Sequence, residues 1–260
     1  MSIITKFEHG NFYLPAYCSG DINKARTFYT SLFGWEAGER AMGDGTLTTL
    51  NINGNLLGNM YEMSDESKNA GVRAHWNSYL VVDSVDEIIN KIEDLGGKLL
   101  RGPMDAEGNP MVNLQDPHGA KFSAWENHTN ESLSTVMNEV GALCWTELIA
   151  HDREAAKKFY AQLIGWEMHP FEGSPMPYTV FNVPGSQPIG GIFERLPEMG
   201  DIPSQWIPYF HVTDADETAR KAEELGGTNH GLIDVKGAGR IAMLQDSEGG
   251  AFAIIRPEMP

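Results

Sequence analysis

Hydrophobic and polar positions at the start of the chain predict a strand, a helix and then three strands. The segment Tyr13–Ser19 is apolar and rich in β-forming residues, and Asp21 follows it at a helix N-cap position. The apolar face of the expected helix has the spacing i, i+3, i+4, i+7 and consists of Ala25, Phe28, Tyr29 and Leu32. Gly34 stands where a left-handed residue ends a helix. Three short strands are expected around residues 35–42, 46–51 and 56–62.

The same order of elements follows once more in the next sixty residues. The segment Trp76–Asp83 predicts a strand, and Ser84 and Glu87 have the spacing of a capping box at the start of a helix. The buried helix face is expected to contain Val85, Ile88, Ile89 and Ile92. Strands are expected around residues 98–101, 111–115 and 120–126, and the turn Asp116–Gly119 joins the last two.

An internal repeat shows that this pair of units occurs twice. The segment FYTSLFGWE at Phe28–Glu36 returns as FYAQLIGWE at Phe159–Glu167, an offset of 131 residues, and Asp83 matches Asp214 at that offset. Later matches have an offset of 130, so one deletion separates the copies. We expect domain 1 at 1–128 (units 13–62 and 76–126), a polar linker at 129–139, and domain 2 at 140–260 (units 143–195 and 207–256).

Three motifs carry a resemblance to a known family. They are D-x-x-x-A-x-x-F-Y-x-x-x-x-G-W, a V-x-D strand end before a helix, and a closing D-P-x-G-A-x-F hairpin. They resemble the vicinal oxygen chelate superfamily, which includes glyoxalase I, extradiol dioxygenases and bleomycin resistance proteins. The segment Cys144–Leu148 (CWTEL) is similar to the start of a domain in a two-domain, glyoxalase-like group. The resemblance implies an α+β fold in which tandem duplicated domains each contain two βαβββ units, with curled mixed sheets around a cavity.

The resemblance also implies where metal ligands would project into each cavity. In the family these ligands are His, Glu or Gln on the first and last strand of each unit. The corresponding positions here are Leu14 and Trp145, Ser78 and Tyr209, Ser123 and Ala253, Gly58, and Gly190 or Gly191. None of these residue types commonly binds a divalent metal, so no family metal site and no cofactor are expected. A divalent metal that uses other ligands remains an alternative.

Two polar residues of domain 2 are the candidates for chemistry. Glu147 and His211 each lie two residues beyond an expected inward position, and because side chains of a strand alternate, both are expected to face the cavity. Domain 1 has Ala16 and Leu80 at the matching places. The pair could act as an acid and a base, or hold a polar group of a ligand. A buried structural pair, or an outward orientation after a shift of one residue, remains open.

Aromatic residues of domain 2 are candidates for a ligand wall. Trp145, Tyr209, Tyr178 and Trp206 could stack on a planar ligand. Aromatic residues in short strands can equally be part of the core, and both interpretations stay open.

Composition and motifs narrow the function further. The formal charge of −17 argues against nucleic acid or an anionic membrane as a partner. The sequence has no apolar run of about 20 residues and no signal peptide, so a cytoplasmic protein is expected. Motifs for nucleotide binding and for an α/β-hydrolase nucleophile are missing from the sequence.

The sequence therefore predicts a small-molecule-binding protein without the family metal ligands. The functional cavity is expected in domain 2, and the protein could be a monomer or a homodimer. Two alternatives remain: a metal-dependent glyoxalase, lyase or dioxygenase, and a metal-free enzyme that uses Glu147 and His211 as acid and base.

Overall fold

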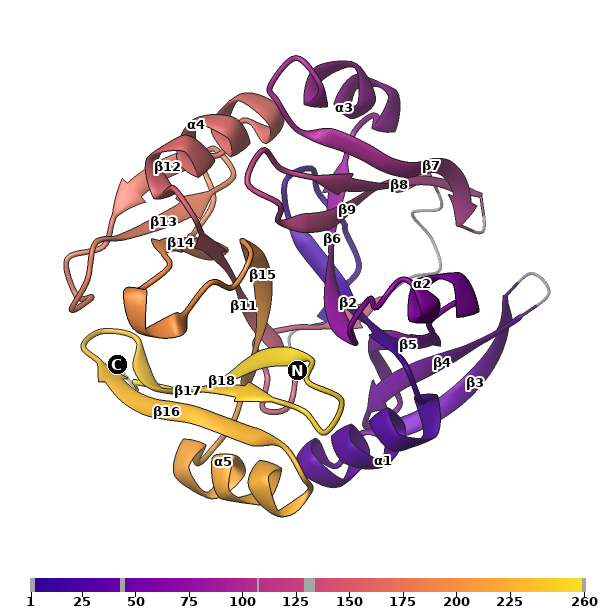
Figure 1. The fold of residues 1–260 in the computed structure, drawn as a ribbon, viewed down its shortest axis with the longest axis vertical. Helices are drawn as coiled ribbons and strands as arrows, with labels where there is room; N and C mark the ends of the chain where they lie inside the picture. The colour runs from indigo at the N-terminus through magenta and orange to yellow at the C-terminus, as the bar shows by residue number, and fades with distance from the viewer. Residues whose placement is uncertain (1–2, 43–44, 107, 129–133, 259–260) are drawn as a thin grey trace.

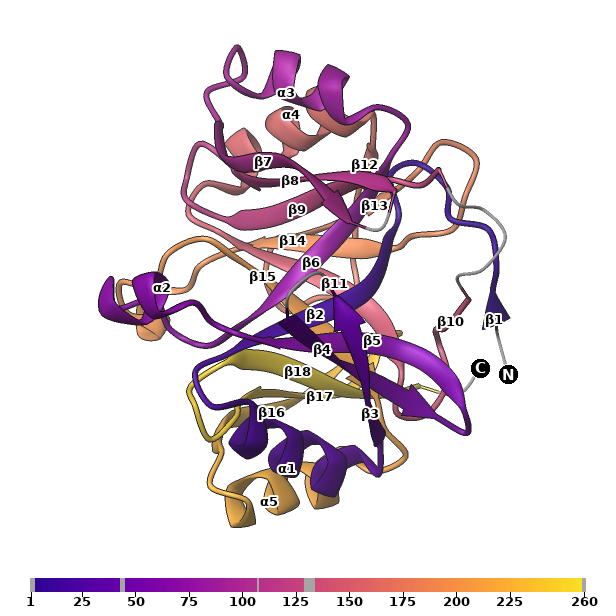
Figure 2. The same ribbon diagram turned by 90° about the vertical axis from the view of Figure 1, so that its right-hand side faces the viewer.

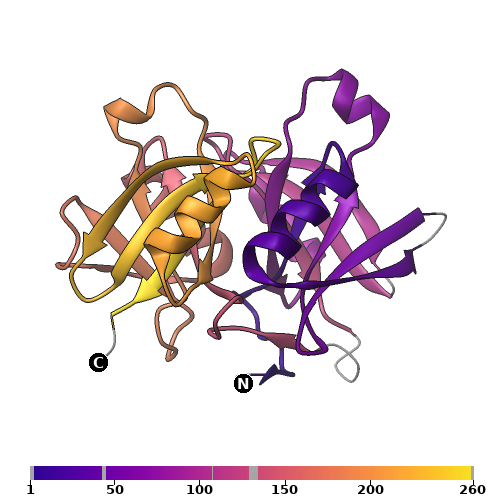
Figure 3. The ribbon, with the colours of Figure 1, turned by 90° about the horizontal axis from the view of Figure 1, so that it is seen from below.

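Two eight-stranded sheets, one in each half of the chain, form the molecule. The computed structural model describes residues 3–42, 45–106, 108–128 and 134–258. In domain 1 the strand order is β3-β4-β5-β2-β6-β9-β8-β7, and in domain 2 it is β12-β13-β14-β11-β15-β18-β17-β16. Figure 3 shows the two domains side by side. No helix among the described residues is long and apolar enough to cross a membrane.

Each sheet consists of two βαβββ units, which confirms the predicted architecture. Domain 1 contains β2 (Phe12–Ser19), α1 (Ile22–Phe33), β3 (Glu36–Met42), β4 (Gly45–Ile52), β5 (Asn55–Glu62), β6 (His75–Val82), α3 (Val85–Ile92), β7 (Lys98–Ala106), β8 (Asn109–Gln115) and β9 (Lys121–Glu126). Domain 2 contains β11 (Leu143–Ala150), α4 (Arg153–Ile164), β12 (Glu167–Pro170), β13 (Tyr178–Asn182), β14 (Gly190–Glu194), β15 (Gln205–His211), α5 (Ala215–Glu224), β16 (Thr228–Val235), β17 (Gly239–Gln245) and β18 (Ala251–Pro257). The first strands of the two units pair antiparallel at the centre of each sheet.

A few short elements lie outside these units. They are β1 (Ile3–Ile4), β10 (Thr135–Val136), α2 (Asp65–Asn69) and a 3₁₀ turn (Pro197–Met199). Strand β10 falls within the expected linker and pairs with β1, so part of that segment is hydrogen-bonded to the N-terminal region. Residues 129–133 of the expected linker lie outside the described residues.

Helix caps confirm most of the sequence signals and correct one of them. Asp21 caps α1 by accepting from the amides of Asn23 and Lys24, and Gly34 ends the helix with a φ of 73°. Helix α3 is capped by Ser84, as the capping box with Glu87 predicts, but the alignment of the two copies has to be corrected. Since Asp214 caps α5, its counterpart is Ser84, and the match of Asp83 with Asp214 was wrong by one residue.

Each long helix packs on strands of its own domain and also against a helix of the other domain. Helix α1 contacts α5, and α3 contacts α4; these pairs lie at opposite ends of the molecule in Figures 1 and 2. One buried core combines Phe28 and Tyr29 of domain 1 with Phe210 of domain 2. The other combines Phe122 of domain 1 with Phe159 of domain 2. The two domains therefore share their hydrophobic cores.

Buried hydrogen bonds of the repeated FY and GW motifs cross between the domains. Tyr29 Oη of domain 1 donates to Asp246 Oδ2 of domain 2 at 2.6 Å, and Tyr160 Oη donates to Asp116 Oδ2 at 3.2 Å in the opposite direction. Each of these tyrosines also accepts a hydrogen bond from a tryptophan. Trp76 Nε1 donates to Tyr29 Oη at 2.8 Å. In the other copy, Trp206 donates to Tyr160 Oη at 3.0 Å.

The tryptophans of the GW motif also donate across the same boundary. Trp35 Nε1 donates to the carbonyl of Gly141, just before β11 of domain 2, and Trp166 Nε1 donates to that of Gly10, just before β2 of domain 1. Both distances are 2.8 Å. The residues that reveal the repeat thus join the two copies.

Tyr29→Phe and Tyr160→Phe should each lower the free energy of unfolding by about 1–3 kcal/mol. Each change removes a donor from a buried carboxylate and an acceptor from a tryptophan. Because the cores are shared, chemical denaturation followed by fluorescence and circular dichroism should show one transition for both domains. Separate transitions for the two halves, or variants as stable as the wild type, would contradict the shared-core interpretation.

Candidate functional site

The side of each sheet away from the helices carries the candidate residues. In domain 2, Ile149 and Ile207 are buried on this side together with Tyr209, and Trp145 and Tyr178 pack against them. Alternate residues such as Leu148 and Phe210 belong to the shared cores instead. The expected inward orientation of β11 and β15 is therefore observed.

Glu147 is a buried carboxylic acid held by two tyrosines. Its exposed fraction is 5 %. Tyr178 Oη donates to Glu147 Oε2 at 2.5 Å, and Tyr209 Oη donates to Oε1. Trp145 Nε1 in turn donates to Tyr178 Oη at 3.0 Å. Two residues that the sequence selected for a ligand wall thus bind Glu147 directly, and a third, Trp145, is linked to it through Tyr178.

Burial determines the protonation of this cluster. Removal of the carboxyl group from water raises the pKa of Glu147 to about 7, although hydrogen bonds from Tyr178 and Tyr209 partly oppose this effect. Burial also raises the pKa of both tyrosines well above the usual value, so they remain neutral donors. Glu147 can therefore gain or lose a proton near neutral pH.

Gly191 makes room for the tyrosine that closes this cluster. Gly191 lies opposite Glu147 on β14. A Cβ at this position would lie 2.0 Å from Tyr178 Oη. Only glycine therefore allows Tyr178 to reach the carboxylate, and the tyrosine ring lies over the backbone of β14 at Gly191.

His211 does not join Glu147 in the structure. The residue opposite Glu147 across the β11–β15 ladder is Ile207, and His211 is four residues further along the strand. At about 3.4 Å per residue, this separation is roughly 14 Å. The hydrogen bonds to the Glu147 carboxylate come from two phenols, and the combination of Glu147 with His211 remains a prediction without a contact to support it.

Trp206 does not belong to the ligand wall, and its assignment there is corrected. It lies one residue before Ile207, so it faces the opposite side of β15. Its ring is buried in the shared core and its Nε1 donates to Tyr160. The alternation of the strand excludes it from the side that carries Tyr209.

The corrected repeat also moves two positions in domain 1. Since Ser84 corresponds to Asp214, Tyr79 and not Ser78 corresponds to Tyr209, and Val81 and not Leu80 corresponds to His211. Tyr79 and Val81 lie on the side of the sheet away from the helices, whereas Leu80 is in the shared core. A slip of one residue reverses the face of every side chain in a strand.

The donor set on these faces does not fit a divalent metal. The inward positions contain Leu14, Asn59, Tyr79 and Ser123 in domain 1, and Trp145, Gly191, Tyr209 and Ala253 in domain 2. Within the described ranges, no group of three or more His, Cys, Asp or Glu side chains could hold a metal ion. Phenols, a hydroxyl and a single amide lack the charge that a divalent cation requires, and Glu147, an inward carboxylate of domain 2, already accepts hydrogen bonds from two phenols.

A cavity of about 390 Å³ lies against the sheet of domain 1. The residues Leu14, Ala16 and Leu47 line it. The strand registers show that these correspond to Trp145, Glu147 and Tyr178 of domain 2. Three larger side chains fill in domain 2 the space that is open in domain 1. The sequence placed the functional cavity in domain 2, and it did not identify this one.

Two lining residues that the sequence did not single out carry buried polar atoms without a partner. They are Asn59, through its Oδ1, and Trp125, through its Nε1. Asn59 was missed because the search centred on the neighbouring glycine, Gly58. An exact count of alternation from Ala16, which pairs with Asn59, would have found it.

Comparison with known proteins agrees with the duplicated fold. Residues 14–123 match the Glyoxalase/Bleomycin resistance protein/Dioxygenase superfamily, and residues 145–255 match a glyoxalase-like domain. The protein CFP32 of Mycobacterium tuberculosis, whose name assigns it provisionally to the glyoxylases, is 32 % identical over 242 residues and 91 % of both chains. The anthracycline biosynthesis protein DnrV of Streptomyces peucetius is 29 % identical over 249 residues, which is 91 % of this chain and 90 % of DnrV.

Solved structures show the same fold at low identity. The Mn(II)-bound glyoxalase of Novosphingobium aromaticivorans has a TM-score of 0.63 at 13 % identity, covering 95 % of this chain and 82 % of that one. The 2,3-dioxygenase LapB of Pseudomonas sp. KL28 has a TM-score of 0.63 at 9 % identity, covering 98 % and 95 %. At this identity the likeness concerns the fold alone.

Glu147→Gln should change how stability depends on pH. Because burial raises the pKa of Glu147 from 4.5 to about 7, the folded state holds this proton more tightly than the unfolded state. Its contribution is therefore fully present below about pH 4.5 and is lost as the pH rises to about 7. Relative to the variant, the wild type should lose roughly 3 kcal/mol of unfolding free energy over that interval in denaturation experiments.

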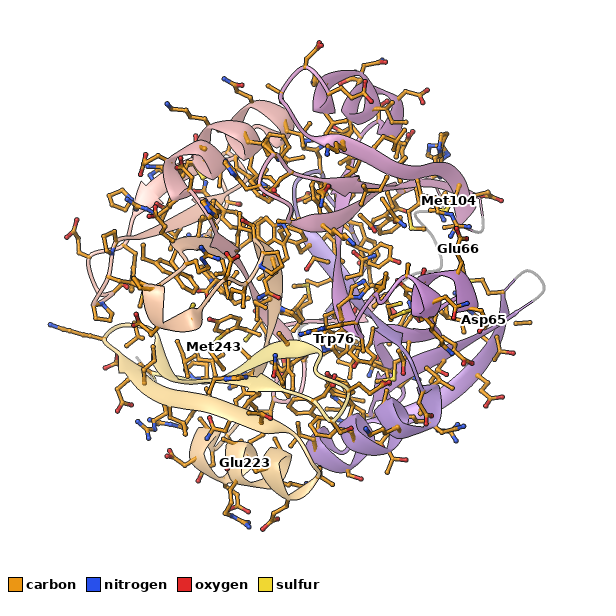
Figure 4. The ribbon with its side chains drawn as sticks, viewed as in Figure 1. Asp65, Glu66, Trp76, Met104, Glu223 and Met243 are labelled. Atoms are coloured by element: carbon orange, nitrogen blue, oxygen red, sulfur yellow. The ribbon has the colours of Figure 1, made fainter. Side chains whose placement is uncertain are left out.

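A suitable control is Glu66→Gln, because Glu66, which is labelled in Figure 4, is exposed on helix α2. The difference between this variant and the wild type should stay nearly constant over the same pH interval. A constant difference for Glu147→Gln as well would mean that Glu147 is not the titrating group.

Metal removal should leave the protein unchanged. Because the inward side chains do not fit a divalent cation, dialysis against EDTA should not alter the melting temperature. Elemental mass spectrometry of untagged protein should find no near-stoichiometric manganese, nickel, zinc or iron. A stoichiometric metal would contradict this assignment, and Glu147, the buried carboxylate on the inward side, would then be the first residue to mutate.

Proposed function

Because the chain belongs to the glyoxalase/bleomycin resistance protein/dioxygenase superfamily, we propose that it binds a small molecule without a metal, in the cavity of domain 1. The observation that carries this proposal is the cavity of about 390 Å³. Its size is within the range typical of ligand sites, and its walls are mostly apolar with a few polar groups.

The composition of the cavity walls supports the binding of a small molecule. Leu14, Met104 and Met111 supply flexible apolar contacts, and Tyr61 and Tyr79 add aromatic rings. Met104 is labelled in Figure 4. Methionine side chains adapt to ligands of irregular shape. The names of the relatives point to different chemistries, a glyoxylase and anthracycline biosynthesis, so the proposal depends on the cavity and not on those names.

Acid–base catalysis in domain 2 is a second candidate function. It is favoured by one observation: Glu147 has a pKa of about 7 and lies between two phenol donors on the inward side of the sheet. A general acid or base works best when its pKa is close to the working pH. If this function exists, the rate of a proton-transfer reaction should change near pH 7, and Glu147→Gln should abolish that change.

Transfer of a domain 2 residue into domain 1 should close the cavity. The neutral dye Nile red should bind the wild type at one saturable site, seen as an increase in its fluorescence. Leu47→Tyr copies Tyr178 into the cavity and should weaken binding at least about tenfold, a loss of about 1.4 kcal/mol. The melting temperature should show that the variant is folded.

The matched control for this experiment is Leu100→Tyr. Leu100 is 44 % exposed on β7 and is not a lining residue of the cavity, so this variant should bind Nile red like the wild type. Equal binding by the wild type and Leu47→Tyr would place the dye elsewhere and contradict the proposal.

A further inference from the structure

We infer that the ligand of domain 1 is a planar aromatic molecule that carries both a hydroxyl donor and a carbonyl acceptor. This inference rests on the proposed function and specifies the ligand class for the same cavity. Two independent observations lead to it: the way domain 2 fills the equivalent space, and the unpartnered polar atoms in domain 1.

Domain 2 shows which shape fills this part of the fold. In domain 2 the indole of Trp145 and the phenol of Tyr178 occupy the inward side of the sheet, and they are joined by a hydrogen bond of 3.0 Å. Domain 1 has Leu14 and Leu47 at the corresponding positions, and both line the open cavity. The volume that is missing in domain 1 is therefore that of flat aromatic rings, one of which carries a hydroxyl group.

The unpartnered atoms define the polar groups of the ligand. Trp125 is 7 % exposed, and its Nε1 is a donor without an acceptor. Asn59 Oδ1 is a buried acceptor without a donor. Each such atom costs about 1–3 kcal/mol when it is left unpaired. A ligand carbonyl would accept from Trp125, and a ligand hydroxyl would donate to Asn59.

The other polar groups deep in the cavity do not compete for these roles. The lining residue Asn113 already accepts through its Oδ1 from Ser123 Oγ at 2.8 Å, and Ser123 Oγ in turn accepts from Asn77 Nδ2 at the same distance. Burial raises the pKa of Tyr79 to about 12, so this phenol is neutral. The two lining arginines, Arg40 and Arg101, are exposed. The buried part of the cavity therefore favours uncharged groups.

The positions of the two atoms indicate an extended ligand. Asn59 is on β5 and Trp125 is on β9, and β2 and β6 lie between these strands. Three strand spacings correspond to roughly 14 Å along a flat sheet, and the curl of the sheet brings the side chains closer together. The hydroxyl and the carbonyl must therefore be on separate parts of the ligand, as in fused rings.

Three related probes test this ligand class by fluorescence titration of the full chain. They are 2-hydroxyanthraquinone, which has both groups, 9,10-anthraquinone, which lacks the hydroxyl, and 2-anthrol, which lacks the carbonyl. Asn59→Leu should weaken the binding of the two hydroxylated probes about 3- to 10-fold and leave the binding of 9,10-anthraquinone unchanged. Trp125→Phe should weaken the binding of the two quinones by a similar factor and leave the binding of 2-anthrol unchanged.

The outcomes separate this inference from the proposed function. Binding of Nile red without binding of any of the three probes would overturn the aromatic class and leave the cavity as a ligand site. If neither Nile red nor the probes bind, the proposed function itself fails. If a variant weakens the binding of all three probes equally, the hydrogen bond assigned to the substituted residue is wrong. Should a variant not fold, the wild type must still bind 2-hydroxyanthraquinone more tightly than each of the other two probes.

Discussion

The buried hydrogen bonds between Tyr29 and Asp246, and between Tyr160 and Asp116, join each domain to the closing hairpin of the other. A carboxylate so deeply buried requires donors, and the tyrosine that supplies one can be positioned only if the helices of both domains pack together. The rest of the fold depends on this constraint. Because the helical side of each sheet is covered by the other domain, the opposite side of each sheet is left for a ligand or for its own side chains.

The side chains on the inward side of the sheet differ between the two domains. In domain 2, Trp145, Glu147 and Tyr178 form a closed, hydrogen-bonded cluster. In domain 1, smaller residues leave a cavity. Duplication provides two copies of one frame, and once the shared cores hold that frame in place, the inward residues of each copy can change independently. The buried carboxylic acid and the open cavity are therefore separate features of one architecture.

The same constraint explains how the inward residues of this fold can change without loss of the fold. The folded state is stabilised by the shared cores and by hydrogen bonds between the domains, and none of these involves the inward positions. Phenols, a hydroxyl, an amide and apolar groups can therefore occupy those positions without loss of the fold. The fold by itself does not specify the chemistry.

The amino-acid sequence by itself determined the duplication, the four βαβββ units, most of the helix caps and the inward orientation of Trp145, Glu147 and Tyr209, but not the contacts of Glu147. These follow from local rules, namely the periodicity of strands and helices and the spacing of repeated motifs. The alignment of the two copies failed by one residue where Asp83 was matched with Asp214 in place of Ser84, and a shift of one residue reverses the face of a strand. This shift produced the wrong positions Ser78 and Leu80.

Only the tertiary structure revealed the cavity of domain 1, the position of Trp206 and the groups that meet Glu147. Each of these depends on contacts between residues far apart in the chain. The cavity of domain 1 depends on how the volumes of Leu14, Ala16 and Leu47 combine across neighbouring strands. The position of Trp206 depends on Tyr160, which its indole contacts in the core shared by both domains. Such packing is a property of the assembled sheets and helices, and no single segment of the sequence contains it.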